Sequence, residues 1–145
     1  MSKSTRNTRR AFTIMEVIVV VVIIGVLAAV IAPRFFSRIA DSRVAVAQSN
    51  ATAIATAMKG YILDCGMPEA GADLSILIDR PANVEEGKWK GPYLENVDQL
   101  KDPWGNDFQL RIPAEFNADF DIVSYGSDGA PGGEGEAADI VNGKR

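Results

Sequence analysis

Residues 12–32 read FTIMEVIVVVVIIGVLAAVIA, an apolar run of 21 residues in which Glu16 is the one charged side chain. As an α-helix this run would be about 30 Å long, enough to cross the hydrocarbon core of a bilayer. Residues 1–11 carry four basic side chains and no acid, which favours a cytoplasmic amino end and an exported remainder. The sequence therefore predicts a single-pass membrane segment over residues 12–33.

Two ordinary interpretations of this segment fit less well. A cleaved secretory signal peptide has an apolar core of about 7–15 residues, whereas this core is longer, contains Glu16 and runs into Pro33. A plain signal anchor fits the length and the charge. It gives no role to Glu16, although a carboxylate within lipid costs a few kcal/mol.

A helix is expected to continue beyond Pro33, which should kink it or mark its exit from lipid. Apolar residues recur there at alternating spacings of four and three, which is typical of a helix with one buried stripe. The stripe consists of Ala40, Val44, Ala47, Ala51, Ile54, Met58 and Tyr61. Residues 34–63 should therefore form the periplasmic half of a long helix that ends at Asp64–Pro68.

Residues 64–145 are expected to form a small β-rich head. The alternation in Phe108–Ile112 predicts a strand, Phe120–Ser124 a second, and Ile140–Val141 a possible third. Asp73 is placed to cap a short helix over residues 73–78. The expected fold class is α+β, with the long helix packed on a small antiparallel sheet.

Composition disfavours several functions. The chain has no histidine and one cysteine, Cys65, so it lacks the commonest general base, most zinc sites and an intrachain disulfide. A net charge of −4 argues against nucleic acid as a partner. Its glycine-rich stretch has no lysine in P-loop spacing. We therefore expect no enzyme activity.

Residues 10–16 resemble the amino-terminal signal of type IV pilins and pseudopilins, reading RAFTIME. In that family a membrane-embedded prepilin peptidase cuts before the Phe and methylates the new amine. The resemblance implies removal of residues 1–11 by cleavage between Ala11 and Phe12, with N-methylation of Phe12. The family nearly always has Gly before the cut, where this chain has the also small Ala11.

Three further segments resemble the major pseudopilin of type II secretion systems. They are WKGPYL at 89–94, DPWGN at 102–106, and YGSDG with the acidic stretch to Ile140. The chain departs from the family where Gly66-Met67-Pro68 replaces the usual Arg-Tyr-Pro, and where a closing Trp is absent. From the residues alone, DPWGN predicts a tight turn with Trp104 in the core.

The resemblance implies a structural subunit that waits in the inner membrane with a periplasmic head. It then assembles with itself into a periplasmic fibre that drives folded proteins through the outer membrane. Implied partners are other copies, minor pseudopilins, the prepilin peptidase, the inner-membrane assembly platform and membrane lipid. Glu16 would serve assembly by pairing with the cationic amine of Phe12, preferably that of a neighbouring subunit.

Other hypotheses remain open. Within the same superfamily the alternative is a type IV pilin or a minor pseudopilin, although long pilins usually have paired cysteines. A second class is an uncleaved, membrane-anchored periplasmic binding module. A third, an anchored hydrolase with paired carboxylates, is disfavoured because a glycine-rich segment does not preorganise an acid and a nucleophile.

The carboxy-terminal loop is a candidate calcium site. Asp128, Glu134, Glu136 and Asp139 lie within it with no cation among them. Crowded carboxylates repel one another and Ca²⁺ prefers oxygen ligands, so an ordered loop would favour this ion, although a solvated acidic loop is the alternative. Carbonyls of Val123, Tyr125 or Ser127 could complete the shell. The resemblance adds that major pseudopilins bind calcium here, with Asp128 and Asp139 at matching positions.

Overall fold

The long helix is the main element of the chain. The computed structural model describes residues 12–144, and for residues 33–37 it describes the backbone only. Helix α1 spans Ile14–Cys65, 52 residues, and continues through Pro33. The expectation of one long helix is therefore confirmed. The chain divides after Arg38 into two compact units.

The amino-terminal unit presents an apolar surface on all sides of α1. Every side chain from Phe12 to Ala32 is exposed within the chain. Among the described residues, Ile14–Ala32 is the one helical stretch long and apolar enough to cross a membrane. A helix that is apolar all round requires lipid or other helices around it.

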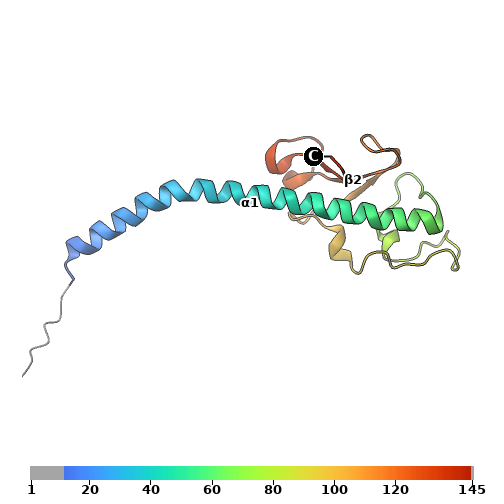
Figure 1. Ribbon diagram of the computed structural model, residues 1–145, viewed down its shortest axis with the longest axis horizontal. Helices are drawn as coiled ribbons and strands as arrows, with labels where there is room; N and C mark the ends of the chain where they lie inside the picture. Colours follow the sequence, from blue (N-terminus) through green and yellow to red (C-terminus); the bar gives the residue numbers. More distant parts are fainter. Residues whose placement is uncertain (1–11, 145) are drawn as a thin grey trace, which may run out of the picture. The chain divides into compact units, whose positions relative to one another are not determined.

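The carboxy-terminal unit, residues 39–144, contains the sheet (Figure 1). The sheet has three antiparallel strands in the order β1 (Gln109–Arg111), β2 (Asp121–Ser124) and β3 (Ile140–Val141). In the register Leu110 lies opposite Ile122 and Val123 lies opposite Val141. All three predicted strands are therefore present, with β2 in the centre and buried along its whole length.

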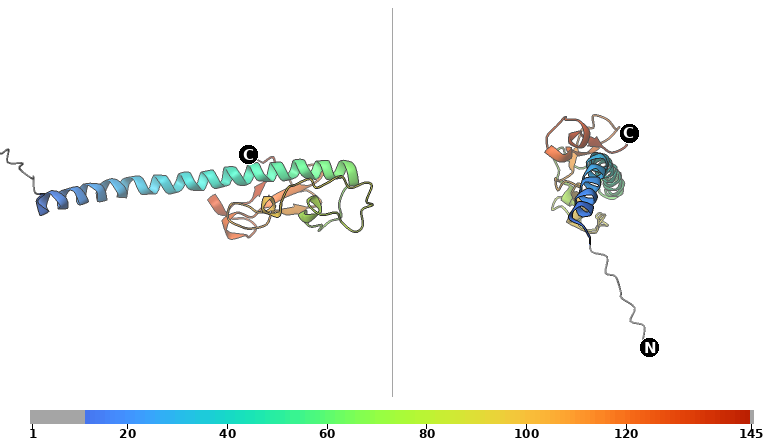
Figure 2. Two further views of the ribbon diagram at one scale, coloured as in Figure 1. Left: turned by 90° about the horizontal axis from the view of Figure 1, so that it is seen from below. Right: turned by 90° about the vertical axis from the view of Figure 1, so that its left-hand side faces the viewer.

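The core of this unit lies between the sheet and one face of α1. Figure 2 shows the sheet and the loops on one side of this part of the helix. The predicted stripe supplies that face: its last five members are buried and its first two, Ala40 and Val44, are half-buried. The sheet side of the core includes Phe108, Phe120 and Ile122. Burial of this stripe is what the four-and-three spacing predicts.

Short 3₁₀ helices connect these elements. The first, η1 (Leu74–Leu77), is capped as expected by Asp73, whose carboxylate accepts from the Ser75 amide. The next, η2 (Val97–Leu100), begins with a reciprocal capping box between Asn96 and Gln99. The last two, η3 (Gly126–Asp128) and η4 (Gly135–Ala137), lie in the terminal loop.

The 89–94 segment packs on the end of α1. The Tyr93 hydroxyl donates to Asp64 Oδ2 at 2.9 Å, and Lys90 Nζ lies 2.9 Å from Asp64 Oδ1. The Tyr93 ring also meets that of Tyr61 edge-on, with centroids 5.8 Å apart. Burial, together with the hydrogen bond to Asp64, raises the pKa of Tyr93 to about 12. These contacts hold the segment in place and give it a structural role.

The core position expected for Trp104 is wrong. Its side chain is only half-buried and lies outside the core cluster. The indole N–H instead donates to Glu136 Oε1 at 3.2 Å. An indole has one polar end, and a partner for that end at the surface keeps the ring partly exposed.

Candidate functional site

The first turn of α1 holds the predicted assembly residue. The Thr13 hydroxyl accepts a hydrogen bond from the Glu16 amide at 3.2 Å, and Glu16 Oε2 accepts one from the Thr13 amide at 3.1 Å. This is a capping box, in which two backbone donors at a helix start are satisfied reciprocally. Glu16 thus has a local partner within its own chain. Ala11 and the predicted cleavage bond lie outside the described residues.

The capping box fixes the place at which the Glu16 carboxylate is available to a cation. One turn of helix holds the carboxylate against the amide of Thr13, the residue that follows Phe12. A carboxylate at a helix amino terminus is also stabilised by the helix dipole. The carboxylate is thus held one residue away from Phe12, whose amine the predicted cleavage would free.

The backbone conformation of the terminal loop requires glycine at several positions. All five glycines between residues 126 and 135 have positive φ. At two of them a side chain would also clash: a Cβ on Gly126 would overlap the Glu136 carbonyl oxygen, and one on Gly133 that of Ala137. The glycine-rich composition therefore allows close backbone packing between η3 and η4, in addition to flexibility.

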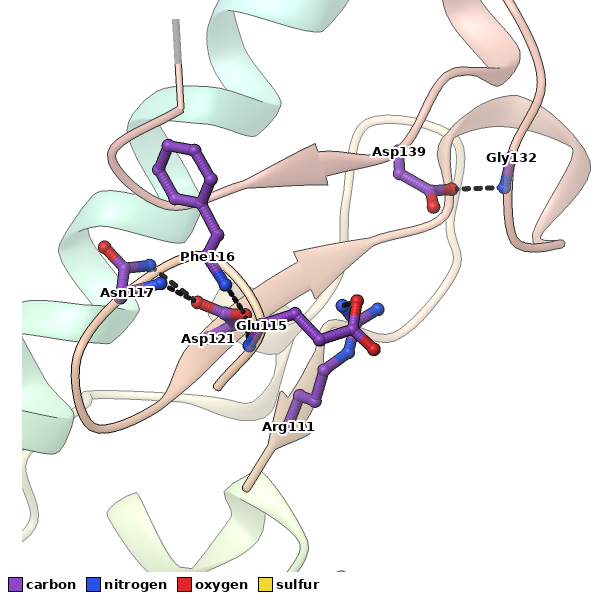
Figure 3. Close-up of polar contacts among 7 residues, drawn as sticks. All are labelled: Arg111, Glu115, Phe116, Asn117, Asp121, Gly132 and Asp139. Carbon is purple, nitrogen blue, oxygen red and sulfur yellow. Dashed lines mark hydrogen bonds and ion pairs between the residues drawn. The ribbon is translucent and has the colours of Figure 1, made fainter. Parts of the chain in front are cut away.

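The four predicted carboxylates lie on this loop without converging. Asp128 is exposed, and its Oδ1 accepts from the Ala130 amide at 3.1 Å. Asp139 is half-buried, and its Oδ1 accepts from the Gly132 amide at 2.9 Å (Figure 3). Glu134 is exposed, whereas Glu136 is half-buried. Within residues 12–144 no three acidic, His or Cys side chains form a cluster that could hold a metal ion.

The residues whose carbonyl oxygens are predicted as calcium ligands lie in two kinds of structure. Val123 belongs to the central strand β2, whereas Tyr125 precedes η3 and Ser127 lies within it. The hydrogen bonds of Asp128 and Asp139 each use Oδ1, so a cation could take the second oxygen. Carboxylate and carbonyl oxygens are the ligands that Ca²⁺ prefers. By this chemistry Asp128 and Asp139, whose carboxylates bind amides of the loop itself, remain the candidate ligands. Glu136 is the poorer candidate because its carboxylate faces Trp104 and Arg43, outside the loop.

The 102–106 turn forms hydrogen bonds with the end of β2 and with the terminal loop at three points. Asp102 Oδ2 accepts from the Ser124 hydroxyl at 2.7 Å, and Asn106 Nδ2 donates to the Gly126 carbonyl at 2.7 Å. The third contact is the bond from Trp104 to Glu136. The DPWGN sequence therefore has a role beyond forming a turn, because it fixes both ends of the loop.

A fifth carboxylate near the loop, Asp121, is used structurally. It is fully buried, and its two oxygens accept from the backbone amides of Glu115, Phe116 and Asn117 and from the Asn117 side chain (Figure 3). Burial acts to raise the pKa of Asp121, but these hydrogen bonds outweigh it and the pKa is lowered. Asp121 thus stays ionised and holds the connection between β1 and β2.

Sequence reasoning missed both Asp121 and the contacts of Asp102. The capping box of η2, by contrast, has a signal in the sequence, because an amide side chain at Asn96 and another three residues later at Gln99 are typical of a helix start. No comparable signal marks Asp121, because its partners are backbone amides brought to it by a reversal of the chain.

The comparisons with known proteins first define a class. Residues 6–32 match the prokaryotic N-terminal methylation motif. This match covers the second half of the basic leader, the capping box and the whole of the exposed apolar stretch Ile14–Ala32. The chain thus belongs to the class of proteins that carry a prokaryotic N-terminal methylation motif.

The rest of the chain defines the family. Residues 34–143 match the model "Type II secretion system (T2SS), protein G". The chain is 39% identical over 140 residues to the type II secretion system core protein G of Pseudomonas aeruginosa, covering 94% of this chain and 96% of that protein. It is 35% identical over 144 residues to that of Vibrio cholerae, covering 98% and 95%.

A solved structure agrees. The crystal structure of the major pseudopilin from the type 2 secretion system of enterohaemorrhagic Escherichia coli matches with a TM-score of 0.56 and 30% identity. The match covers 70% of this chain and 83% of that one. The chain therefore belongs to the type II secretion system protein G family, the family of the major pseudopilin. The matched relatives are structural pseudopilins rather than enzymes.

Proposed function

We propose that this chain is inserted in the inner membrane, processed by a prepilin peptidase, and assembled into a periplasmic pseudopilus that drives folded proteins across the outer membrane. Other copies of the chain form the body of this fibre. Minor pseudopilins and an inner-membrane assembly platform are its further partners. Family membership supports the proposal, and the observation that carries it is the apolar surface of Ile14–Ala32.

The need for assembly follows from that surface. A fully apolar helix leaves lipid only if other apolar helices replace the lipid. Glu16 and a cationic Phe12 would each be costly in such a bundle unless they are paired. Pairing between subunits would lower that cost and set the axial register of the fibre.

The test is the yield of fibres from a Glu16→Ala variant in a bacterium that carries the other secretion components. We expect membrane insertion and an unchanged melting temperature of the head, but loss of most fibres and of secretion. Glu69→Ala, at an exposed position of the head, is the matched control and should assemble normally. Normal fibres from Glu16→Ala would contradict the proposal.

We also propose that the terminal loop binds one Ca²⁺ through Asp128 and Asp139, with loop carbonyls completing the shell. The support is the pair of carboxylates on a loop that glycines hold in closely packed turns. Bound calcium would offset the repulsion among the loop carboxylates and so order the exposed part of the loop.

Titration calorimetry on the metal-free full-length protein in detergent tests this site. We expect one Ca²⁺ per chain for the wild type, and none for Asp128→Ala or Asp139→Ala. Asp119→Ala, an exposed carboxylate between β1 and β2, should bind like the wild type. Absence of binding to the wild type at about millimolar Ca²⁺, the weak end for extracellular sites, would reject the site.

A further inference from the structure

Glu136 is the carboxylate of the terminal loop that reaches outside the loop. Its Oε1 accepts from Trp104 Nε1 at 3.2 Å and lies 3.7 Å from Arg43 Nη1. Trp104 belongs to the 102–106 turn, and Arg43 to α1. We call these three residues the Glu136 latch. Through it, the loop is tied at one point to both the turn and the helix.

Backbone packing places Glu136 for this contact. The η4 turn lies so close to η3 that only glycine fits at Gly126, and so close to the preceding bend that only glycine fits at Gly133. Within η4 the Ala137 amide donates to the Glu134 carbonyl, and the Ala138 amide to that of Gly135. The turn is therefore a defined element, and its one long side chain points to Trp104.

We propose that Glu136 is a positioning residue that docks η4 on Trp104 and α1 whether or not an ion is bound, and that it is not an ion ligand. Its carboxylate faces Trp104 and Arg43, both outside the loop, whereas the carboxylates of Asp128 and Asp139 bind amides within the loop. A single residue, Ala138, separates η4 from Asp139. Docking of η4 therefore also fixes the position of Asp139. The inference rests on the proposed calcium site only for the second measurement below.

If Glu136 were a calcium ligand, the effect of its substitution would combine differently with a substitution of Trp104 than if it were a latch. A latch acts chiefly through its bond to the indole, so Trp104→Phe should reproduce most of the effect of Glu136→Ala, which also breaks the exposed contact to Arg43. Removing both partners should then add nothing to the effect of Glu136→Ala. A ligand acts on the ion, so its effect is independent of Trp104 and is absent without calcium. A double-mutant cycle measures this difference directly.

The first measurement is hydrogen exchange of the peptide around residues 135–139, in the calcium-free full-length protein in detergent. Glu136→Ala and Trp104→Phe should each raise exchange about fivefold, the value of one ordinary hydrogen bond. The double variant should exchange no faster than Glu136→Ala alone. Glu134→Ala, the exposed neighbour, is the control and should leave exchange unchanged. Unchanged exchange in Glu136→Ala, or additive effects in the double variant, would overturn the latch.

The second measurement is calcium affinity by calorimetry for the same variants. Glu136→Ala and Trp104→Phe should weaken binding by a similar factor and keep one site per chain. Loss of all binding in Glu136→Ala with unchanged affinity in Trp104→Phe would show a ligand and overturn the proposal. A wild type that binds no Ca²⁺ would reject the calcium site, and the exchange measurement would still decide the latch.

Discussion

Thr13 and Glu16 exchange hydrogen bonds across the first turn of α1, with each residue's side chain accepting from the other's amide. The pair lies within residues 6–32, which match the methylation motif, and at the start of the helix whose stretch Ile14–Ala32 is apolar enough to span a membrane. The carboxylate is therefore held in a fixed place before any second subunit arrives. Thr13 therefore helps to hold the Glu16 carboxylate in this position.

Thr13→Ala should loosen the first turn of α1. Loss of a helix-capping hydroxyl costs about 1 kcal/mol, so amide exchange in residues 14–17 should rise about fivefold in detergent micelles. Thr13→Ser keeps the hydroxyl and is the matched control. Equal exchange in Thr13→Ala and Thr13→Ser would show that the capping box has no energetic role.

Asp121→Asn should destabilise the head by about 3 kcal/mol, because the buried amide donors of residues 115–117 lose a charged acceptor. Thermal or urea unfolding measures this loss. Asp119→Asn, an exposed carboxylate of the same connection, should change stability by less than about 0.5 kcal/mol.

The same pair of proteins gives a pH test. The pKa of Asp121 is lowered in the folded head, so its stabilisation is complete above the unfolded pKa of about 4 and is lost as pH falls through the lower folded value. The stability difference between wild type and Asp121→Asn should therefore be constant above about pH 5 and shrink in more acidic solution. A difference that does not depend on pH would contradict an ionised Asp121.

Tyr93 gives the opposite pH dependence. Its pKa rises to about 12 in the folded head, chiefly by burial. Stability from a raised pKa is complete below the unfolded value, about 10, and is lost as pH rises toward 12. Tyr93→Phe should remove much of this alkaline loss, while Tyr61, whose pKa burial also raises, keeps a part. Identical alkaline slopes in unfolding experiments would show that the Tyr93 hydroxyl is not buried as described.

Chelation should weaken the head if the loop binds calcium. At a Ca²⁺ concentration a hundredfold above Kd, binding adds about 2.7 kcal/mol, so EDTA should lower Tm by about 10 °C. Protease cleavage within residues 126–139 should rise in parallel, and added Ca²⁺ should reverse both effects. Asp128→Ala should respond to neither reagent; a full response from this variant would place the ion elsewhere.

Periodic features of the fold could be predicted from the sequence, and the assignment of individual carboxylates could not. The four-and-three spacing identified the buried face of α1, and alternation identified the strands, because both patterns follow from local geometry. In the sequence, nothing distinguishes Asp121, Asp128 and Glu136, which are all acidic residues in or near the terminal loop. Their different roles arise from tertiary contacts: amides of a chain reversal bind Asp121, and the indole of Trp104 binds Glu136.

The central claim is that this chain is processed and assembled as a pseudopilin. Mass analysis of the amino terminus, on protein taken from purified fibres, tests it most directly. The account predicts a chain that begins at Phe12 and carries one methyl group on its amine. Fibres built from chains that begin at Met1, or that begin within the apolar helix, would contradict it.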